Sequence, residues 1–290
     1  MAVAEGLVNA LTIDVEDFFQ VAAFEAHLER SRWLAIDSRV EANTDRILAL
    51  LECHRTRATF FVLGWIACRH PGLVRRIVAG GHELASHGFD HVRATRQDPV
   101  TFLADVTATR HFLEEVGQVP VVGYRAATYS IGRDNLWALE RLRRAGYLYS
   151  SSIYPIRHDL YGMPEAPPTP FRPHPGGVVE LPVATVTVGG QRIPCGGGGY
   201  FRLFPYAFSR WALRRLNHRE GRPAIFYCHP WELDPDQPRL PHIGLRSRFR
   251  HYLNLHRMED RLSALLRDFR WGPIVQVFRD VIPGAEAPRP

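Results

Sequence analysis

Short apolar segments alternate with longer amphipathic ones along the first half of the chain. The apolar segments are rich in β-branched and aromatic residues and are bounded by Gly, Pro or charged positions, which is typical of strands buried on both faces. A regular alternation of strand and helix predicts an α/β domain built on a parallel sheet or an α/β barrel. The predicted strands are residues 7–13, 58–63, 83–86, 119–124 and 148–153, and the predicted helices are residues 46–52, 72–79, 102–115 and 135–145.

The alternation is interrupted after residue 153. Seven prolines between residues 155 and 175 exclude a long helix or a central strand from this insertion. Gly189 and Gly190 then separate two β-rich segments, so we expect a hairpin that pairs residues 178–187 with residues 191–194. Further on, the pattern predicts helices at residues 206–219 and 245–266 and strands at residues 224–228 and 274–277.

The chain of 290 residues is long enough for one large α/β domain. We expect its core at about residues 8–233, a C-terminal helix and strand within residues 234–281, and a flexible Pro-rich tail at residues 282–290. An apolar fraction of 46% and a charged fraction of 23% are those of an ordinary soluble globular protein.

The net charge of +6 comes from Arg alone, because the chain contains no Lys. The Arg residues are scattered and are not interleaved with aromatic stacking motifs, which argues against nucleic-acid binding, although a basic surface would suit an acidic glycan. The four cysteines form no CxxC pair, so we expect buried free thiols in a reducing compartment. No signal peptide or membrane-spanning segment is visible, which predicts a cytoplasmic protein and leaves its oligomeric state open.

Three acids, Asp14, Glu16 and Asp17, follow the first predicted strand. Ligands and catalytic groups gather at the C-terminal ends of strands in α/β folds. Three carboxylates placed there repel one another unless a cation or an Arg balances them. The alternative is the acidic first turn of a helix, which is about as common a cause of this pattern.

A histidine pair, His87 and His91, follows the predicted strand 83–86. A lone HxxxH spacing is weak evidence for a metal, since ordinary core or surface histidines also produce it. Because the pair and the acidic cluster both follow parallel strands, we expect them to meet. One carboxylate and two imidazoles leave coordination positions free for water and substrate, which favours a catalytic site over a structural one.

Two further strand ends carry polar groups. Arg125 follows the strand 119–124 and could hold a carboxylate ionised and oriented, although any one Arg can equally form a surface ion pair. His229 follows the strand 224–228 and is the candidate general acid. The glycine run at residues 196–199 lacks the ending of a phosphate loop, so we expect a mobile or plain connecting loop.

These elements in this order, together with ATFFVLG at residues 58–64, resemble the NodB-type polysaccharide deacetylases of carbohydrate esterase family 4. Residues 11–21, 150–164 and 196–205 resemble the subfamily linked to exosortase and PEP-CTERM exopolysaccharide loci. The resemblance covers about residues 8–233. It implies a distorted (β/α) barrel with fewer than eight parallel strands, and hydrolysis of N-acetyl groups from hexosamine units of a polysaccharide or its precursor.

The resemblance also implies roles for individual residues. Asp14 matches the general base, Arg125 the residue that tethers this base, and His229 the general acid. His87 and His91 match ligands of a divalent metal, for which Zn²⁺ is the first choice. Val15 replaces the usual metal carboxylate, so we expect Glu16 to be the third ligand because it lies on the same side of the strand as Asp14, with Asp17 as the alternative.

The chain departs from the family pattern at two more positions. Ala127 stands where Pro is usual, and Ser150 stands where an Asp would orient and charge the catalytic histidine. Without that carboxylate, the pKa of His229 should be low and the general acid weakened. The acids that could replace it are Asp159, Glu180 and Glu232, and the sequence does not choose among them.

Three other functions fit parts of this pattern. A 2-His-1-carboxylate Fe(II) oxygenase would use the same ligand types, but that chemistry usually occurs on a double-stranded β-helix. A related amidase would act on small ureide-like amides. A catalytically impaired glycan-binding protein would account for Ala127 and Ser150.

Overall fold

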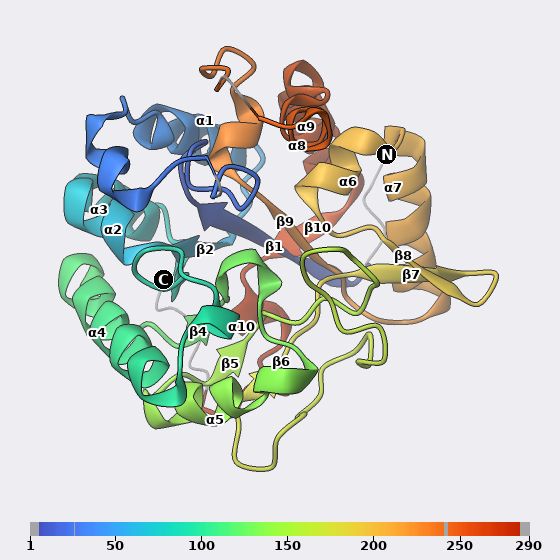
Figure 1. The fold of residues 1–290 in the computed structure, drawn as a ribbon. Helices are drawn as coiled ribbons and strands as arrows, with labels where there is room; N and C mark the ends of the chain where they lie inside the picture. The colour runs from blue at the N-terminus through green and yellow to red at the C-terminus, as the bar shows by residue number, and fades with distance from the viewer. Residues whose placement is uncertain (1–5, 26, 241–242, 285–290) are drawn as a thin grey trace.

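The computed structural model describes residues 6–25, 27–240 and 243–284. Its central feature is a parallel sheet that curves into an incomplete barrel (Figure 1). Among the described residues, seven strands form the barrel wall in the order β9-β1-β2-β3-β4-β5-β6. An eighth strand, β10, pairs in parallel with the first residues of β1. The strands are β1 (Val8–Val15), β2 (Thr59–Val62), β3 (Glu83–Ser86), β4 (Gly123–Tyr124), β5 (Tyr149–Ser150), β6 (Val179–Glu180), β9 (Ile225–Cys228) and β10 (Arg270–Gly272). This confirms the distorted barrel with a wall of fewer than eight strands.

Helices cover the outside of this wall (Figure 1). Strand alternation explains the packing, because Leu11, Ile13 and Val15 of β1 face the helices whereas Ala10 of the same strand faces the barrel interior. The helices that follow the first strands are α1 (Val40–Cys53), α2 (Gly64–Arg69), α3 (Pro71–Ala79), α4 (Pro99–Gly117) and α5 (Trp137–Arg144). The later ones are α6 (Gly198–Leu203), α7 (Tyr206–Arg214), which continues as a π-helix (Arg215–Arg219), α8 (Leu245–Tyr252), α9 (Met258–Asp268) and α10 (Ile274–Val277).

The Pro-rich insertion forms as predicted, and the hairpin forms across the predicted turn with a shorter first strand, because Val179 and Glu180 pair with β5 in the barrel instead. Between β5 and β6 the chain makes no helix, and β7 (Thr185–Val188) pairs antiparallel with β8 (Gln191–Pro194) across Gly189 and Gly190. Both glycines have positive φ, at 56° and 78°, which is the turn geometry that favours glycine.

The C-terminal region corrects three expectations. Residues 274–277 form helix α10 instead of a strand, and the last strand, β10, lies a few residues earlier. The helix predicted at residues 245–266 is broken at Asn254, whose φ of 52° is left-handed, into α8 and α9. Ile282 is buried at 3% exposure, so the tail does not begin at this residue; residues 285–290 lie outside the described part of the chain.

Helix α10 closes the end of the barrel where the strands begin. Its residues Ile274 and Val275 join the cluster inside the barrel. The backbone amide of Ile274 donates to Thr59 Oγ1 (2.8 Å) and that of Val275 to Glu83 Oε2 (3.2 Å), at the first residues of β2 and β3. The opposite end of the barrel, where the strands finish, is left for the candidate site.

Two of the four cysteines differ from expectation. Cys195 and Cys228 are buried, but Cys53 and Cys68 are exposed, because they lie on the outer faces of α1 and α2. All four are free thiols. No described helix combines the length and the hydropathy needed to cross a membrane.

Candidate metal centre and active site

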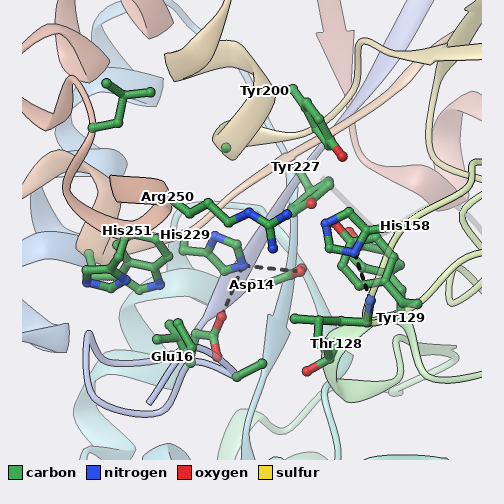
Figure 2. A pocket seen from close by; sticks show the side chains of 18 of the residues that line it. Asp14, Glu16, Thr128, Tyr129, His158, Tyr200, Tyr227, His229, Arg250 and His251 are labelled. Carbon is green, nitrogen blue, oxygen red and sulfur yellow. Dashed lines mark hydrogen bonds and ion pairs between the residues drawn. The ribbon is translucent and has the colours of Figure 1, made fainter. Parts of the chain in front are cut away.

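Polar residues at the C-terminal ends of four strands meet at one end of the barrel. Asp14 lies on β1, His87 follows β3, Arg125 follows β4 and His229 follows β9. They meet because parallel strands place their C-terminal ends at the same edge. Asp14, Glu16, His87, His91 and His229 line a pocket of about 500 Å³, seen in part in Figure 2.

Glu16, His87 and His91 form a group that could hold a metal ion. Each offers one ligand atom, and the three atoms lie within 4.8 Å of one another. His87 Nδ1–H donates to the backbone carbonyl of Arg125 (2.8 Å), which leaves Nε2 as the atom with a free lone pair. Glu16 Oε2 is buried without a hydrogen-bond partner. Burial lowers the pKa of His91 to about 4, which keeps this imidazole in the neutral form that binds metals.

The loop that carries His91 has an unusual backbone. His91 has a φ of 54°, and Gly88 has a φ of 77°. Left-handed residues other than glycine are uncommon and cluster at functional sites. Arg30 fixes this turn by donating to the carbonyls of Asp90 (2.9 Å) and His91 (3.3 Å). The fold therefore maintains a strained turn that brings His91 back to within 3.2 Å of Glu16.

Asp17, the alternative metal carboxylate, is not part of this group among the described residues. Its Oδ2 accepts hydrogen bonds from Ser38 Oγ (2.7 Å) and from the amides of Arg39 (2.9 Å) and Val40 (3.2 Å), at the start of α1. Its Oδ1 accepts from the amide of Phe18 (2.9 Å). Asp17 thus caps a helix, which favours Glu16 over Asp17 as the metal carboxylate.

Asp14 and Arg125 form a buried ion pair. Arg125 Nη1 lies 2.5 Å from Asp14 Oδ1 and 2.8 Å from Thr12 Oγ1, and the whole Arg125 side chain is inaccessible to solvent. Its Nε and Nη2 donate to the backbone carbonyl and Oγ of Ser151 (3.0 Å each), and its guanidinium lies 4.1 Å from the centre of the Phe61 ring. The guanidinium is held at both ends, so it fixes the Asp14 carboxylate in position.

His229 lies between two carboxylates. Its Nε2 is 3.0 Å from Glu16 Oε1 and 4.0 Å from Asp14 Oδ2, and its Nδ1 is 2.7 Å from Glu232 Oε1. Burial lowers the pKa of His229, but the charges of Glu16 and Glu232 and their hydrogen bonds outweigh burial and raise it to about 10. A low pKa of His229 was expected only if no other acid replaced the missing carboxylate, and Glu232 lies in that place.

Two family models match parts of this chain. Residues 25–149 match the polysaccharide deacetylase family, and residues 151–279 match a domain of unknown function, DUF3473.

Curated relatives match part of this chain over part of their own length. A chitooligosaccharide deacetylase of Rhizobium leguminosarum bv. trifolii is 34% identical over 118 residues, which are 40% of this chain and 52% of the relative. A peptidoglycan-N-acetylglucosamine deacetylase of Listeria monocytogenes is 44% identical over 54 residues, which are 19% of this chain and 12% of the relative. The chain thus spans from about an eighth to about half of these two relatives.

A solved structure shares the whole fold. It is provisionally named a polysaccharide deacetylase, from Mycobacterium smegmatis, and superposes with a TM-score of 0.62 at 20% identity. The match covers 100% of this chain and 96% of the other. At this identity the likeness shows the fold, including the part of this chain beyond residue 149.

In this site, Glu232 fills the place beside His229 that the sequence assigned to position 150. Ser150 instead donates from its Oγ to Ser152 Oγ (2.8 Å). Glu180 accepts from the amides of Ser152 (2.7 Å) and Ile153 (2.8 Å). Asp159 pairs with arginines of α8. Of the three candidate acids, Glu232 alone contacts His229 among the described residues.

Sequence reasoning missed Arg202, which supports Glu232 from behind. Arg202 is 2% exposed, and its Nε donates to Glu232 Oε2 (2.6 Å). The glycine run at residues 196–199 was the sequence feature that could have pointed to Arg202. Its last two glycines begin helix α6, which carries Arg202, whereas we expected a mobile or connecting loop. A Cβ atom on Gly198 would lie 2.2 Å from Glu232 Oε1, so only glycine leaves room for this carboxylate.

Proposed function

We propose that this protein is a metal-dependent hydrolase that removes N-acetyl groups from hexosamine units of a polysaccharide or its precursor, in exopolysaccharide biosynthesis. The observation that carries the proposal is the meeting of the Glu16, His87 and His91 group with the Asp14–Arg125 pair and His229 in one pocket. Relatives named as deacetylases of chitooligosaccharide and peptidoglycan support the reaction type. DUF3473 is consistent with the exosortase-linked subfamily.

Glu16, His87 and His91 are the residues that would hold the ion, and they fit it. The unpartnered Glu16 Oε2, the neutral His91 and the fixed orientation of His87 are the donor set of a site with open coordination positions. A divalent ion, for which Zn²⁺ is the first choice, would supply Lewis acidity toward the acetyl carbonyl and the attacking water.

The remaining residues perform the proton transfers. Asp14, oriented by Arg125, takes the proton from the water that attacks the acetyl carbon. His229, whose Nδ1 is hydrogen-bonded to Glu232, delivers a proton to the nitrogen as the C–N bond breaks. Amines are poor leaving groups, so such an acid contributes about 10²–10⁴-fold in rate.

Acetate release tests the proposal directly. The purified protein is incubated with a panel of N-acetylated oligosaccharides and with a small ureide-like amide, before and after chelation, and again after a divalent metal is restored. We expect acetate from at least one oligosaccharide, loss of release on chelation and recovery with metal. Binding of oligosaccharides without acetate would favour an impaired glycan-binding protein, and turnover of the ureide alone would favour an amidase.

A further inference from the structure

The catalytic pocket is acidic at its inner end, beside the candidate metal ligands, and basic at its outer end, which we call the mouth. Of the described residues that line the pocket, the acidic ones are Asp14 and Glu16, both on the metal side. Two arginines of helix α8, Arg246 and Arg250, line the outer part. Arg250 projects from α8 toward the space between His229 and His158 (Figure 2).

One carboxylate balances both arginines. Asp159 Oδ2 lies 3.2 Å from Arg246 Nη2 and 3.2 Å from Arg250 Nη1. A single negative charge between two guanidinium groups leaves a net positive charge at the mouth. Each guanidinium carries five N–H donors in a planar fork, so both keep donors for a second anion.

The position of these arginines is built into the fold. The buried guanidinium of Arg202 donates to the backbone carbonyls of Arg250 (3.2 Å), His251 (3.0 Å) and Leu253 (2.6 Å), at the end of α8. The His251 ring also stacks on Trp231, with ring centres 4.2 Å apart. The same Arg202 that supports Glu232 therefore fixes the helix that carries Arg250.

Apolar and aromatic groups surround the positive charge. His158 stacks on Tyr161 with ring centres 4.0 Å apart, and both line the pocket. Phe249 is 58% exposed and also lines the pocket. Flat aromatic faces beside guanidinium donors suit a pyranose ring that bears an anionic substituent.

We propose that Arg246 and Arg250 form a subsite for an anionic substituent, a carboxylate or a phosphate, on the glycan whose hexosamine occupies the metal end of the pocket. The inference rests on the proposed function only in that the pocket takes a glycan. It assigns the substrate to the acidic or phosphorylated class. It also gives the helix α8, which carries no catalytic residue, a part in specificity.

Binding without turnover tests the subsite. The metal-loaded Asp14→Asn variant is titrated with diacetylchitobiose, with its 1-phosphate, and with a disaccharide of N-acetylglucosamine and glucuronate. We expect at least one anionic disaccharide to bind about threefold to tenfold more tightly than the neutral one at low salt, and the advantage to shrink with added salt. The phosphate and glucuronate arms show which anion the subsite takes.

Variants of α8 assign the effect to residues. Arg246→Gln with Arg250→Gln should remove the advantage and leave the affinity for the neutral disaccharide within about twofold. Arg248→Gln, an exposed arginine of the same helix that does not line the pocket, should keep it. Equal binding of all three disaccharides, or an advantage that survives the double substitution, would overturn the proposal.

A membrane surface is the competing occupant of this basic and apolar mouth. Sedimentation with phosphatidylglycerol vesicles that depends on Arg246 and Arg250, without any preference for anionic disaccharides, would replace the subsite with a lipid-binding surface. The subsite and the proposed function can fail independently. If the native protein releases no acetate, the dissociation constants of the three disaccharides still test the subsite.

Discussion

At the scale of single residues, the site depends on how carboxylates share a few cations. Glu16 and Glu232 contact opposite nitrogens of His229, Asp14 pairs with Arg125, and Asp17 caps α1. Asp14, Glu16 and Asp17 lie within four residues, and yet each of these three has a different partner. Their roles therefore follow from side-chain direction and partners, and two substitutions separate them.

Replacing Glu232 by Gln should weaken the general acid. Loss of the carboxylate favours the neutral imidazole, so the pKa of His229 falls and the alkaline limb of the pH–rate profile moves to lower pH by about one unit or more. At pH values above the limb of the native protein, we expect kcat to fall about tenfold for each unit by which the pKa drops, with little change in KM. Asp159→Asn is the control, because Asp159 lies at the mouth; if it moved the limb and Glu232→Gln did not, the partner would be wrongly assigned.

Glu16→Gln and Asp17→Asn should have opposite effects. Glu16→Gln removes a ligand charge, so the bound metal measured after dialysis should fall well below one ion per chain. Asp17→Asn should keep the metal and lower the free energy of unfolding in urea by about 1–2 kcal/mol, because it weakens the cap of α1. Metal loss in Asp17→Asn together with full occupancy in Glu16→Gln would reverse the assignment.

At the scale of elements, helix α6 connects the pocket mouth to the catalytic histidine. Its residue Arg202 binds Glu232 and the last carbonyls of α8, and its first residue, Gly198, packs against the Glu232 carboxylate. One short helix thus positions both the general acid and the basic mouth of the pocket.

A methyl group on α6 should disturb this connection. In Gly198→Ala the new Cβ would lie 2.2 Å from Glu232 Oε1, so the carboxylate must move away from His229. We expect the same shift of the alkaline limb as in Glu232→Gln, with normal metal content. Gly199→Ala is the matched control, since its new methyl group would meet no atom within 4 Å, and it should leave the limb unchanged. An unchanged limb in Gly198→Ala would show that Glu232 does not set it.

At the scale of the whole molecule, the barrel joins distant parts of the chain. Strands β9 and β10, from the last third of the sequence, both pair with β1. This supports the expectation that the whole chain is a single domain, which stays a prediction. The core also extends beyond residue 233, because β10 and α10 pack against the start of the barrel.

Buried Glu180 should make the stability of the fold depend on pH. Burial raises its pKa to about 7 from the ordinary value of 4.5, so the folded state binds this proton more tightly than the unfolded state. The stability that this proton contributes is fully present below pH 4.5 and is lost as the pH rises through 7. Urea unfolding should show a loss of about 2–3 kcal/mol between pH 5 and pH 8 from this group.

Glu180→Gln isolates that contribution. The amide oxygen can still accept from the amides of Ser152 and Ile153, but it carries no charge at any pH. The variant should therefore lose less stability than the native protein as the pH rises. Identical pH dependence in the two proteins would mean that Glu180 does not titrate in this range.

The order of apolar and polar residues predicted a parallel α/β fold and the convergence of the main site residues, whereas the distorted barrel and the roles of these residues came from the family resemblance. Alternating buried strands and helices fix the parallel order, and parallel strands place their C-terminal ends together, so Asp14, His87, Arg125 and His229 had to converge. The period-2 geometry of β1 also pointed to Glu16 over Asp17.

The other features depend on tertiary contacts. The four residues of α10 are too few to show a helical or strand period, so their apolar character fits either element. The partner of His229 is set by Arg202 and Gly198, which lie about thirty residues before Glu232 and reach it only through the packing of α6. Local pattern carries no information on such contacts, because they depend on which buried charges the folded chain brings within hydrogen-bond distance.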